Sequence, residues 1–305
     1  MATCIRGRPC YMEKSAVYMS LDRRLRELYQ QVATAGMQRH RWKLHIAMDE
    51  DTPEHERERI FREVSQAIAR DIEHASETAG ELIEAESFKL FAKSYFAAAA
   101  AFALSRYYSR QELRLLYSAS ISFPGTPLPT FPKGNVSSQI AQLKADRARS
   151  EFYFKRALKR LGQSDTMTAA IMSDFREAFN RGEGVHKIAR SIRDTTNAEL
   201  YKAKRISQTE CLRASNQGNY TAACHAVDEH GFQLSKTWHA AHDDRTRDPH
   251  LDASGQTVLF EQPFIIDGAE LMYPLDVNAP PELTINCRCS ASYRVVGFQK
   301  GVDTA

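Results

Sequence analysis

Apolar residues recur every three or four positions along most of the first 195 residues, the spacing that gathers side chains on one face of an α-helix. The pattern predicts helices over residues 21–45, 54–72, 81–117, 138–162 and 164–180, then a short helix over 185–192 and a long helix over 198–229. Residues 1–20 are mixed in character, and we expect them to be loosely ordered. The N-terminal two thirds of the chain should therefore be mainly helical.

Two proline-containing sequences mark a helix start and a break in the helical pattern. Thr52-Pro53-Glu54 has the composition of a helix start, with a capping hydroxyl, a proline in the first turn and an acid near the positive end of the helix dipole. Segment 122–136 holds four prolines within nine residues, which no helix accommodates. It is either an interdomain linker or a long stiff loop. We favour a loop inside the helical region, because helical spacing resumes after it.

Short alternating runs replace the helical pattern after residue 232. Alternation of apolar and polar residues between Gly-rich and Pro-rich connections is typical of strands. The predicted strands are residues 233–240, 257–260 and 290–295. We expect residues 233–296 to form a small antiparallel sheet packed on the 198–229 helix. The predicted fold class is α+β, with a helical region over residues 1–195 and a smaller α+β domain over residues 196–305.

Composition narrows the class of protein. The 305 residues are 43% hydrophobic, which is enough for a folded core, and 41 basic against 38 acidic side chains give a formal net charge of +3. This balance argues against a strongly basic DNA-binding domain. The six cysteines are too sparse for the disulfide framework of a small secreted protein. We expect a soluble protein made in a cytoplasm, because residues 1–9 lack a signal-peptide core and the most apolar run, 96–104, is too short to span a bilayer.

One local basic segment is Arg39-His40-Arg41-Trp42-Lys43. This segment could contact the phosphates of a nucleic acid, with Trp42 stacking on a base. Alternatively, it is an ordinary solvated helix face.

Candidate metal chemistry centres on Cys287 and Cys289. In a strand their two sulfurs would point to the same face. His250 with either His239 or His242 would complete the four nitrogen and sulfur ligands of a structural zinc site. The alternative is a pair of small buried thiols, since free cysteine behaves as a buried hydrophobe. A structural zinc ion is therefore a candidate cofactor.

The charged run that contains Asp244, Arg245, Arg247 and His250 also allows two interpretations. Contacts between arginine and carboxylate groups would form a network that fixes a loop. A histidine flanked by acids and arginines would instead act as a general base beside an anion clamp.

Several short motifs follow one another at defined spacing in the C-terminal third. They are Thr209-Glu210 with Arg213, Asn216 and Gly218, then Lys236-Thr237-Trp238, Asp243-Asp244-Arg245-Thr246-Arg247-x-x-His250, Gly255-Gln256-Thr257-Val258, Pro263-Phe264, Met272-Tyr273-Pro274-x-Asp276 and Asn286-Cys287-Arg288-Cys289. In this order the motifs resemble the C-terminal domain of the phage Mu F-like head morphogenesis family, the minor head proteins of tailed phages. The resemblance covers residues 185–296. Residues before this range match the family only in being helical.

Two positions depart from the family pattern. Gln208 stands where the family has Arg before the Thr-Glu pair, and Leu275 stands where it often has Gly after Tyr-Pro. The first lies on the long helix and the second in a turn, so neither alters Asp244, His250 or the cysteine pair.

The resemblance implies a minor head (capsid) protein of a tailed bacteriophage that acts in head morphogenesis near the portal and in DNA packaging or ejection. It implies a virion location, in the head interior or at the portal vertex, and as partners the portal protein and the major capsid or scaffolding protein, with viral DNA as a further candidate. No catalytic residue is expected. The residues of the structural motif are Glu210, Trp238, Asp244, Arg245, Arg247, His250, Asn286, Cys287, Arg288 and Cys289.

Two other function classes stay open on the sequence alone. A metal-assisted hydrolase or nuclease would be centred on Asp244, His250, Cys287 and Cys289, and would need an open metal position and a placed base. A DNA-binding module would need a basic face, which the near-neutral charge does not suggest.

Overall fold

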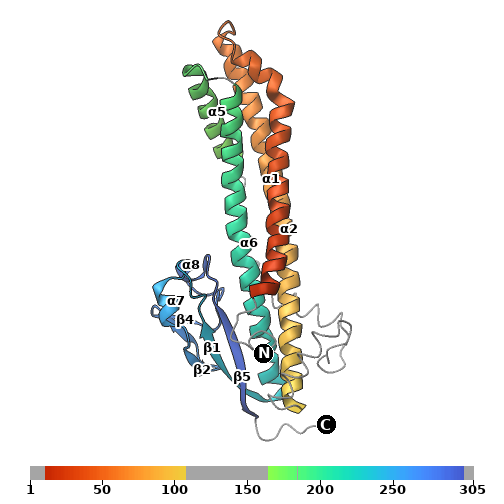
Figure 1. Cartoon of the computed structure of the whole chain (residues 1–305), viewed down its shortest axis with the longest axis vertical. Coiled ribbons are helices and arrows are strands. Elements are labelled where there is room, and N and C mark those ends of the chain that lie inside the picture. The colour runs from red at the N-terminus through yellow and green to blue at the C-terminus, as the bar shows by residue number, and fades with distance from the viewer. Residues whose placement is uncertain (1–10, 108–163, 184, 299–305) are drawn as a thin grey trace. The chain divides into compact units, whose positions relative to one another are not determined.

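A computed structural model describes residues 11–107, 164–183 and 185–298 (Figure 1). The described chain begins with the long helices α1 (Tyr11–Ala47), α2 (Glu54–Tyr107), α5 (Ser164–Asn180) and α6 (Val185–His230). It continues with β1 (Phe232–His239), α7 (Asp248–Asp252), β2 (Thr257–Leu259), β3 (Phe264–Ile266), β4 (Ala269–Leu271), α8 (Pro281–Thr284) and β5 (Ser290–Phe298). Helices followed by a small α+β region confirm the predicted fold class.

β1 is the middle strand of a three-stranded antiparallel sheet with the order β2-β1-β5. Ser235 of β1 lies opposite Leu259 of β2 on one side and Arg294 of β5 on the other. β3 and β4 form a separate antiparallel pair whose turn contains Gly268 at a φ of 76°. The antiparallel sheet predicted within residues 233–296 is therefore confirmed.

The chain divides into two compact units, each built from segments that are distant in sequence. Among the described residues, the first unit contains residues 11–17, 85–107 and 208–298, and the second contains residues 18–84, 164–183 and 185–207. Helices α2 and α6 each contribute a stretch to both units. The boundary expected between residues 195 and 196 lies inside α6, and as a division between functional domains it stays a prediction.

The second unit is a packed set of helical segments. The rings of Phe61 and Phe175 are both buried and meet edge to face with their centroids 5.5 Å apart. The buried hydroxyls of Tyr29 and Ser76 are 2.9 Å apart, so the tyrosine has a polar partner inside the core. Arg57 donates to the carbonyl oxygens of Ala47, Asp49 and Thr52, which satisfies acceptors left over where α1 ends.

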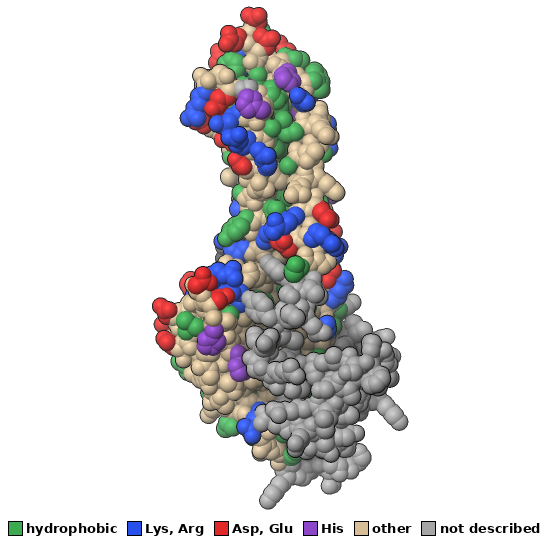
Figure 2. All heavy atoms as spheres, viewed as in Figure 1, with side chains coloured by type: hydrophobic (Ala, Val, Ile, Leu, Met, Phe, Trp, Pro, Cys, Tyr) green, Lys and Arg blue, Asp and Glu red, His purple; other side chains and the backbone are tan. Residues whose placement is uncertain are grey.

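Charged side chains of the basic segment on α1 are paired within this unit. Arg39 donates to Asp71 at 3.0 Å, Lys43 pairs with Glu63, and Trp42 is 60% exposed. Basic and acidic side chains are also interspersed on the face shown in Figure 2. These pairs favour the interpretation of residues 39–43 as a solvated helix face, while contact with DNA stays a prediction.

Small side chains bring the α2 and α6 segments of the first unit close together. The buried residues of the core that they share with the sheet include Ala98, Ala99, Phe102, Ala222, Ala223, Ala226, Phe232, Leu234, Phe260 and Tyr293. Gly218 of α6 lies so close to α2 that a Cβ built on it would stand 2.4 Å from the carbonyl oxygen of Phe91. The buried Ala98 and Ala99 of α2 are thus part of this close packing.

Three helix predictions were wrong in their boundaries. The helices expected over 54–72 and from 81 onward are one helix, α2, within the described residues. Helix α1 begins at Tyr11, because residues 11–20 contain neither glycine nor proline and nothing in them stops the helix. The separate helices expected over 185–192 and 198–229 are one helix, α6. The polar residues between them continue the helix, since the buried Thr196 hydroxyl donates to the carbonyl oxygen of Ile192 one turn earlier.

Some predicted features lie outside the described residues. These are segments 1–10, 108–117, 122–136 and 138–162. None of the described helices combines the length and the hydropathy that a membrane crossing requires.

We expect Gly218→Ala to destabilise the protein by about 1–3 kcal/mol, because the added methyl group meets the backbone of α2, which cannot move aside as a flexible side chain would. Gly36→Ala is the matched control, since its methyl group would meet only Cγ1 of Ile68 at 3.5 Å and alanine favours the helix. Urea denaturation followed by circular dichroism measures both. Equal midpoints for the two variants would contradict the close approach.

Candidate functional site

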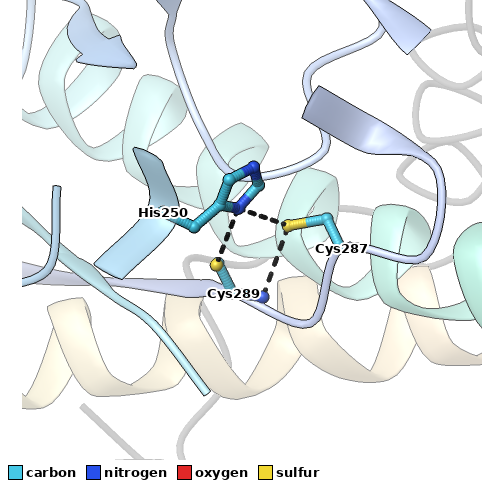
Figure 3. Close-up of side chains that lie close together, drawn as sticks. All are labelled: His250, Cys287 and Cys289. Carbon is cyan, nitrogen blue, oxygen red and sulfur yellow. Dashed lines mark hydrogen bonds between the residues drawn. The ribbon is translucent and has the colours of Figure 1, made fainter. Parts of the chain in front are cut away.

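His250, Cys287 and Cys289 come together inside the first unit (Figure 3). His250 lies on α7, whose first turn contains Pro249, and the two cysteines lie in the extended segment that leads into β5. Nδ1 of His250 is 3.2 Å from Sγ of Cys289 and 3.5 Å from Sγ of Cys287. The three side chains are 2–3% exposed. The sulfurs face the histidine together, although residues 287–289 precede β5 and do not form the strand that was expected at the cysteines.

Electrostatics in this cluster favour one thiolate at Cys287. The thiol of Cys289, aided by His250, lowers the pKa of Cys287. The neighbouring Cys287 sulfur in turn raises the pKa of Cys289, because a second negative charge beside the first is unfavourable.

Trp238 forms one wall of the cluster. It is fully buried in β1, and its ring meets the ring of His250 at 71° with centroids 5.9 Å apart. Phe264 packs edge to face on the other part of the indole at 5.3 Å. The apolar residues that complete this core include Ala240, Ala253, Ile266, Leu271, Leu275 and Leu283. The cluster is therefore a polar centre within an apolar shell.

Polar side chains of α6 bind the backbone of the C-terminal loops. Asn216 Nδ2 donates to the carbonyl oxygen of Cys289 at 3.0 Å, and the Thr209 hydroxyl accepts from the N–H of Asn286 at 3.1 Å. Arg213 Nε donates to the carbonyl oxygen of Leu275 at 3.2 Å. These three α6 positions are four and three residues apart, which places them on one face of the helix.

Two of the anchored residues have unusual backbone conformations. Leu275 has a φ of 64° and Asn286 a φ of 59°, in the left-handed region that costs a non-glycine residue energy. This conformation explains why glycine suits the position of Leu275. The leucine side chain is fully buried in the apolar core, and that burial offsets part of the backbone cost. Glu210 supports the anchor because its carboxylate pairs with Arg213 inside the protein.

The charged run after β1 forms a network, but with a different acid from the one expected. Asp243, not Asp244, makes two hydrogen bonds with the guanidinium of Arg288. Asp243 also accepts from the N–H of Arg245 at 3.1 Å and from the Thr246 hydroxyl at 3.0 Å. The hydrogen bonds from Arg288, with those from Thr246 and Arg245, hold the pKa of Asp243 well below its usual range.

The other predicted residues of this run are peripheral. Asp244 and Arg245 are exposed, and Arg247 donates to the carbonyl oxygen of Ile285. His239 lies 2.8 Å from the Ser292 hydroxyl, and His242 lies 2.9 Å from the Ser254 hydroxyl. Within the described ranges, neither histidine belongs to the group that could hold a metal, so the prediction that one of them is a fourth ligand was wrong.

Sequence reasoning missed the buried Lys236. Its Nζ donates to the carbonyl oxygen of Met272 at 2.9 Å and lies 5.1–5.9 Å from the ring centres of Tyr220, Phe260 and Phe264. Burial lowers the pKa of Lys236 to about 8. The alternation of β1 could have revealed it, because Lys236 lies between the buried Leu234 and Trp238 at a spacing of two.

Comparison with known proteins finds a family match over this region. Residues 169–292 match the family model described as phage Mu protein F like protein. A stretch of 148 residues, 47% of this chain, is 30% identical to the NAD(+)--arginine ADP-ribosyltransferase EFV of Enterococcus faecalis. That stretch covers only 29% of the relative's length, so most of the relative has no counterpart in the match. No solved structure matches significantly.

We expect Asp243→Asn to lower the melting temperature at neutral pH, because the Arg288 guanidinium is only 5% exposed and loses its carboxylate partner. A lowered carboxyl pKa stabilises the fold above the ordinary aspartate pKa of about 3.9, and this contribution is lost as the pH falls toward the folded value. The difference from the wild type should therefore be constant between about pH 5 and 7 and shrink below about pH 4.

Asp244→Asn is the matched control for this experiment. Its side chain is exposed, so its melting temperature should follow that of the wild type at every pH. Melting curves recorded across the pH range show whether Asp243 or Asp244 forms the stabilising ion pair with Arg288. Equal effects of both substitutions would contradict the assignment of the ion pair to Asp243.

Proposed function

We propose that the chain is a minor head protein that acts in head morphogenesis near the portal of a tailed phage, because residues 169–292 match the phage Mu protein F like model. The family match itself indicates a head morphogenesis protein. The finer assignment, namely few copies near the portal with a part in DNA packaging or ejection, is the proposal. Its supporting observation is that the matched range contains α6, β1 and the motifs whose side chains hold the domain together.

The partners proposed for the chain are the portal protein and the major capsid or scaffolding protein, with viral DNA as a further candidate. The proposed location is the head interior or the portal vertex. A near-neutral chain with paired surface charges is better suited to contacts with other proteins than to extended binding of a phosphate backbone. The portal protein is therefore the first partner to test.

We propose that this role is not catalytic. The hydrolase or nuclease alternative needs Asp244 beside a metal that substrate can reach, but Asp244 is exposed and lies outside the group of His250, Cys287 and Cys289. That group is almost completely buried. The activity named for the Enterococcus faecalis relative belongs to a protein of which the match covers a minor part, so it does not support an enzymatic role here.

A gene replacement tests the proposed role. In a phage that carries this gene, a chain without residues 233–296 should give heads that form poorly or lack the protein, with unchanged host range, because the deletion removes the sheet and the anchored loops. Plaque counts and the protein content of purified heads measure the effect. The Asp244→Asn chain, altered only at an exposed side chain, should assemble normally.

Cross-linking in purified wild-type heads tests the location. The proposal predicts cross-links from the lysines of this chain to the portal protein. Normal and fully infectious particles from the deletion gene would contradict a role in head morphogenesis. Cross-links confined to the major capsid protein would contradict the location near the portal and leave the coarser role intact.

A further inference from the structure

The geometry points to a structural zinc site formed by His250, Cys287 and Cys289, with a water molecule as the fourth ligand. The site would close the first unit by joining α7 to the segment that precedes β5. It is independent of the proposed role in head assembly, because it concerns how this chain is held together and not what the chain binds.

The ligand atoms already have the spacing of a metal site. Tetrahedral zinc with bonds of about 2.3 Å to sulfur and about 2.0 Å to nitrogen places these atoms about 3.5–3.8 Å apart. Nδ1 of His250 lies 3.2 Å and 3.5 Å from the two sulfurs, and all three ligand atoms lie within 4.8 Å of one another. Binding would therefore need shifts of only a few tenths of an ångström for the two nitrogen to sulfur distances.

Energetics favour a metal over a cluster of hydrogen-bonded thiols. A thiol is a weak donor and a weak acceptor, so contacts among these groups offset little of the cost of removing an imidazole from water. Two thiolates and a neutral imidazole around a divalent cation carry no net charge. Such a neutral assembly is compatible with the apolar shell formed by Trp238 and Phe264.

The donor set selects the metal. Two sulfurs with one imidazole nitrogen suit zinc, whereas calcium and magnesium require oxygen ligands. His239 and His242 are held by the Ser292 and Ser254 hydroxyls, which leaves the fourth position to water. Zinc with three protein ligands and one water is also the pattern of catalytic sites. Here the ligands are 2–3% exposed, so substrate cannot approach and the role is structural.

The position of the site gives the metal a mechanical role. Asn216 of α6 already binds the backbone of Cys289, and Arg288 between the cysteines binds Asp243 in the loop after β1. A metal at the cysteines would add the link to α7. Three connections from different segments would then converge on residues 287–289. Short strands such as β2, β3 and β4 bury little apolar surface, so their burial offsets only part of the chain entropy that is lost on folding. A metal cross-link would offset more of this loss.

Elemental analysis of the full-length wild-type protein tests the site directly. After purification without chelators we expect about one zinc ion per chain, and X-ray absorption at the zinc edge should show two sulfur ligands with nitrogen or oxygen completing the shell. Zinc at the background level of the buffer, with no uptake after zinc is added, would overturn the proposal. A first shell without sulfur would overturn it as well.

Substitutions connect the metal to these residues. Cys287→Ser, Cys289→Ser and His250→Gln should each lose the zinc and melt roughly several degrees lower than the wild type. His242→Asn and Cys211→Ser are the matched controls, because they remove an imidazole and a buried thiol outside the group. Asparagine also tolerates the positive φ of residue 242. Both controls should keep the metal.

A chelator separates a metal from simple packing. It should lower the melting temperature of the wild type and of the two controls and leave Cys289→Ser unchanged. An equal effect on all proteins, or none on the wild type, would overturn the proposal. If the ligand variants do not fold, cobalt exchange in the wild type decides, since thiolate-to-cobalt charge-transfer absorption is expected and its absence would exclude cysteine ligation.

Discussion

The first unit depends on a row of polar side chains along one face of α6. Arg213 and Asn216 donate to the buried carbonyl oxygens of Leu275 and Cys289, and Thr209 accepts from the backbone N–H of Asn286. An unpaired buried peptide group costs about 1–3 kcal/mol. Each of these hydrogen bonds therefore favours the loop conformation in which it can form. The positive φ values at Leu275 and Asn286 persist because the α6 side chains bind the loop at these same residues. The helix side chains therefore help to fix these loop conformations, together with the tolerance of Asn286 for a positive φ and the burial of the Leu275 side chain.

This anchoring positions the chemistry of the domain. Asn216 binds the carbonyl oxygen of Cys289, and the ion pair of Asp243 with Arg288 fixes the residue between the two cysteines. Both sulfurs consequently face His250 from one side of an extended segment. The cluster stands within an apolar core around Trp238. This arrangement is suited to holding the first unit rigid.

Much of this structure could be predicted from the sequence. Helical spacing located α5 and most of α2, alternation located β1 and β5, and the motif order resembled the family whose model matches residues 169–292. The same alternation would also have predicted that the Lys236 side chain is buried, but this was missed. The choice of Asp243 over Asp244 could not be predicted, because it depends on a loop in which His242 has a φ of 52°. The continuity of α6 was missed because the polar run at residues 193–197 lacks an apolar stripe, yet it contains no helix breaker.

Hydrogen exchange of the Asn216→Ala protein tests the central claim that α6 shapes the loops. The substitution removes the donor to Cys289 and leaves that buried carbonyl oxygen without it. The account predicts faster amide exchange in residues 286–290, with unchanged exchange in α1 and in residues 54–84 of α2. Unchanged protection of residues 286–290 in a folded Asn216→Ala protein would contradict the claim, because the loop would then hold its conformation without the helix.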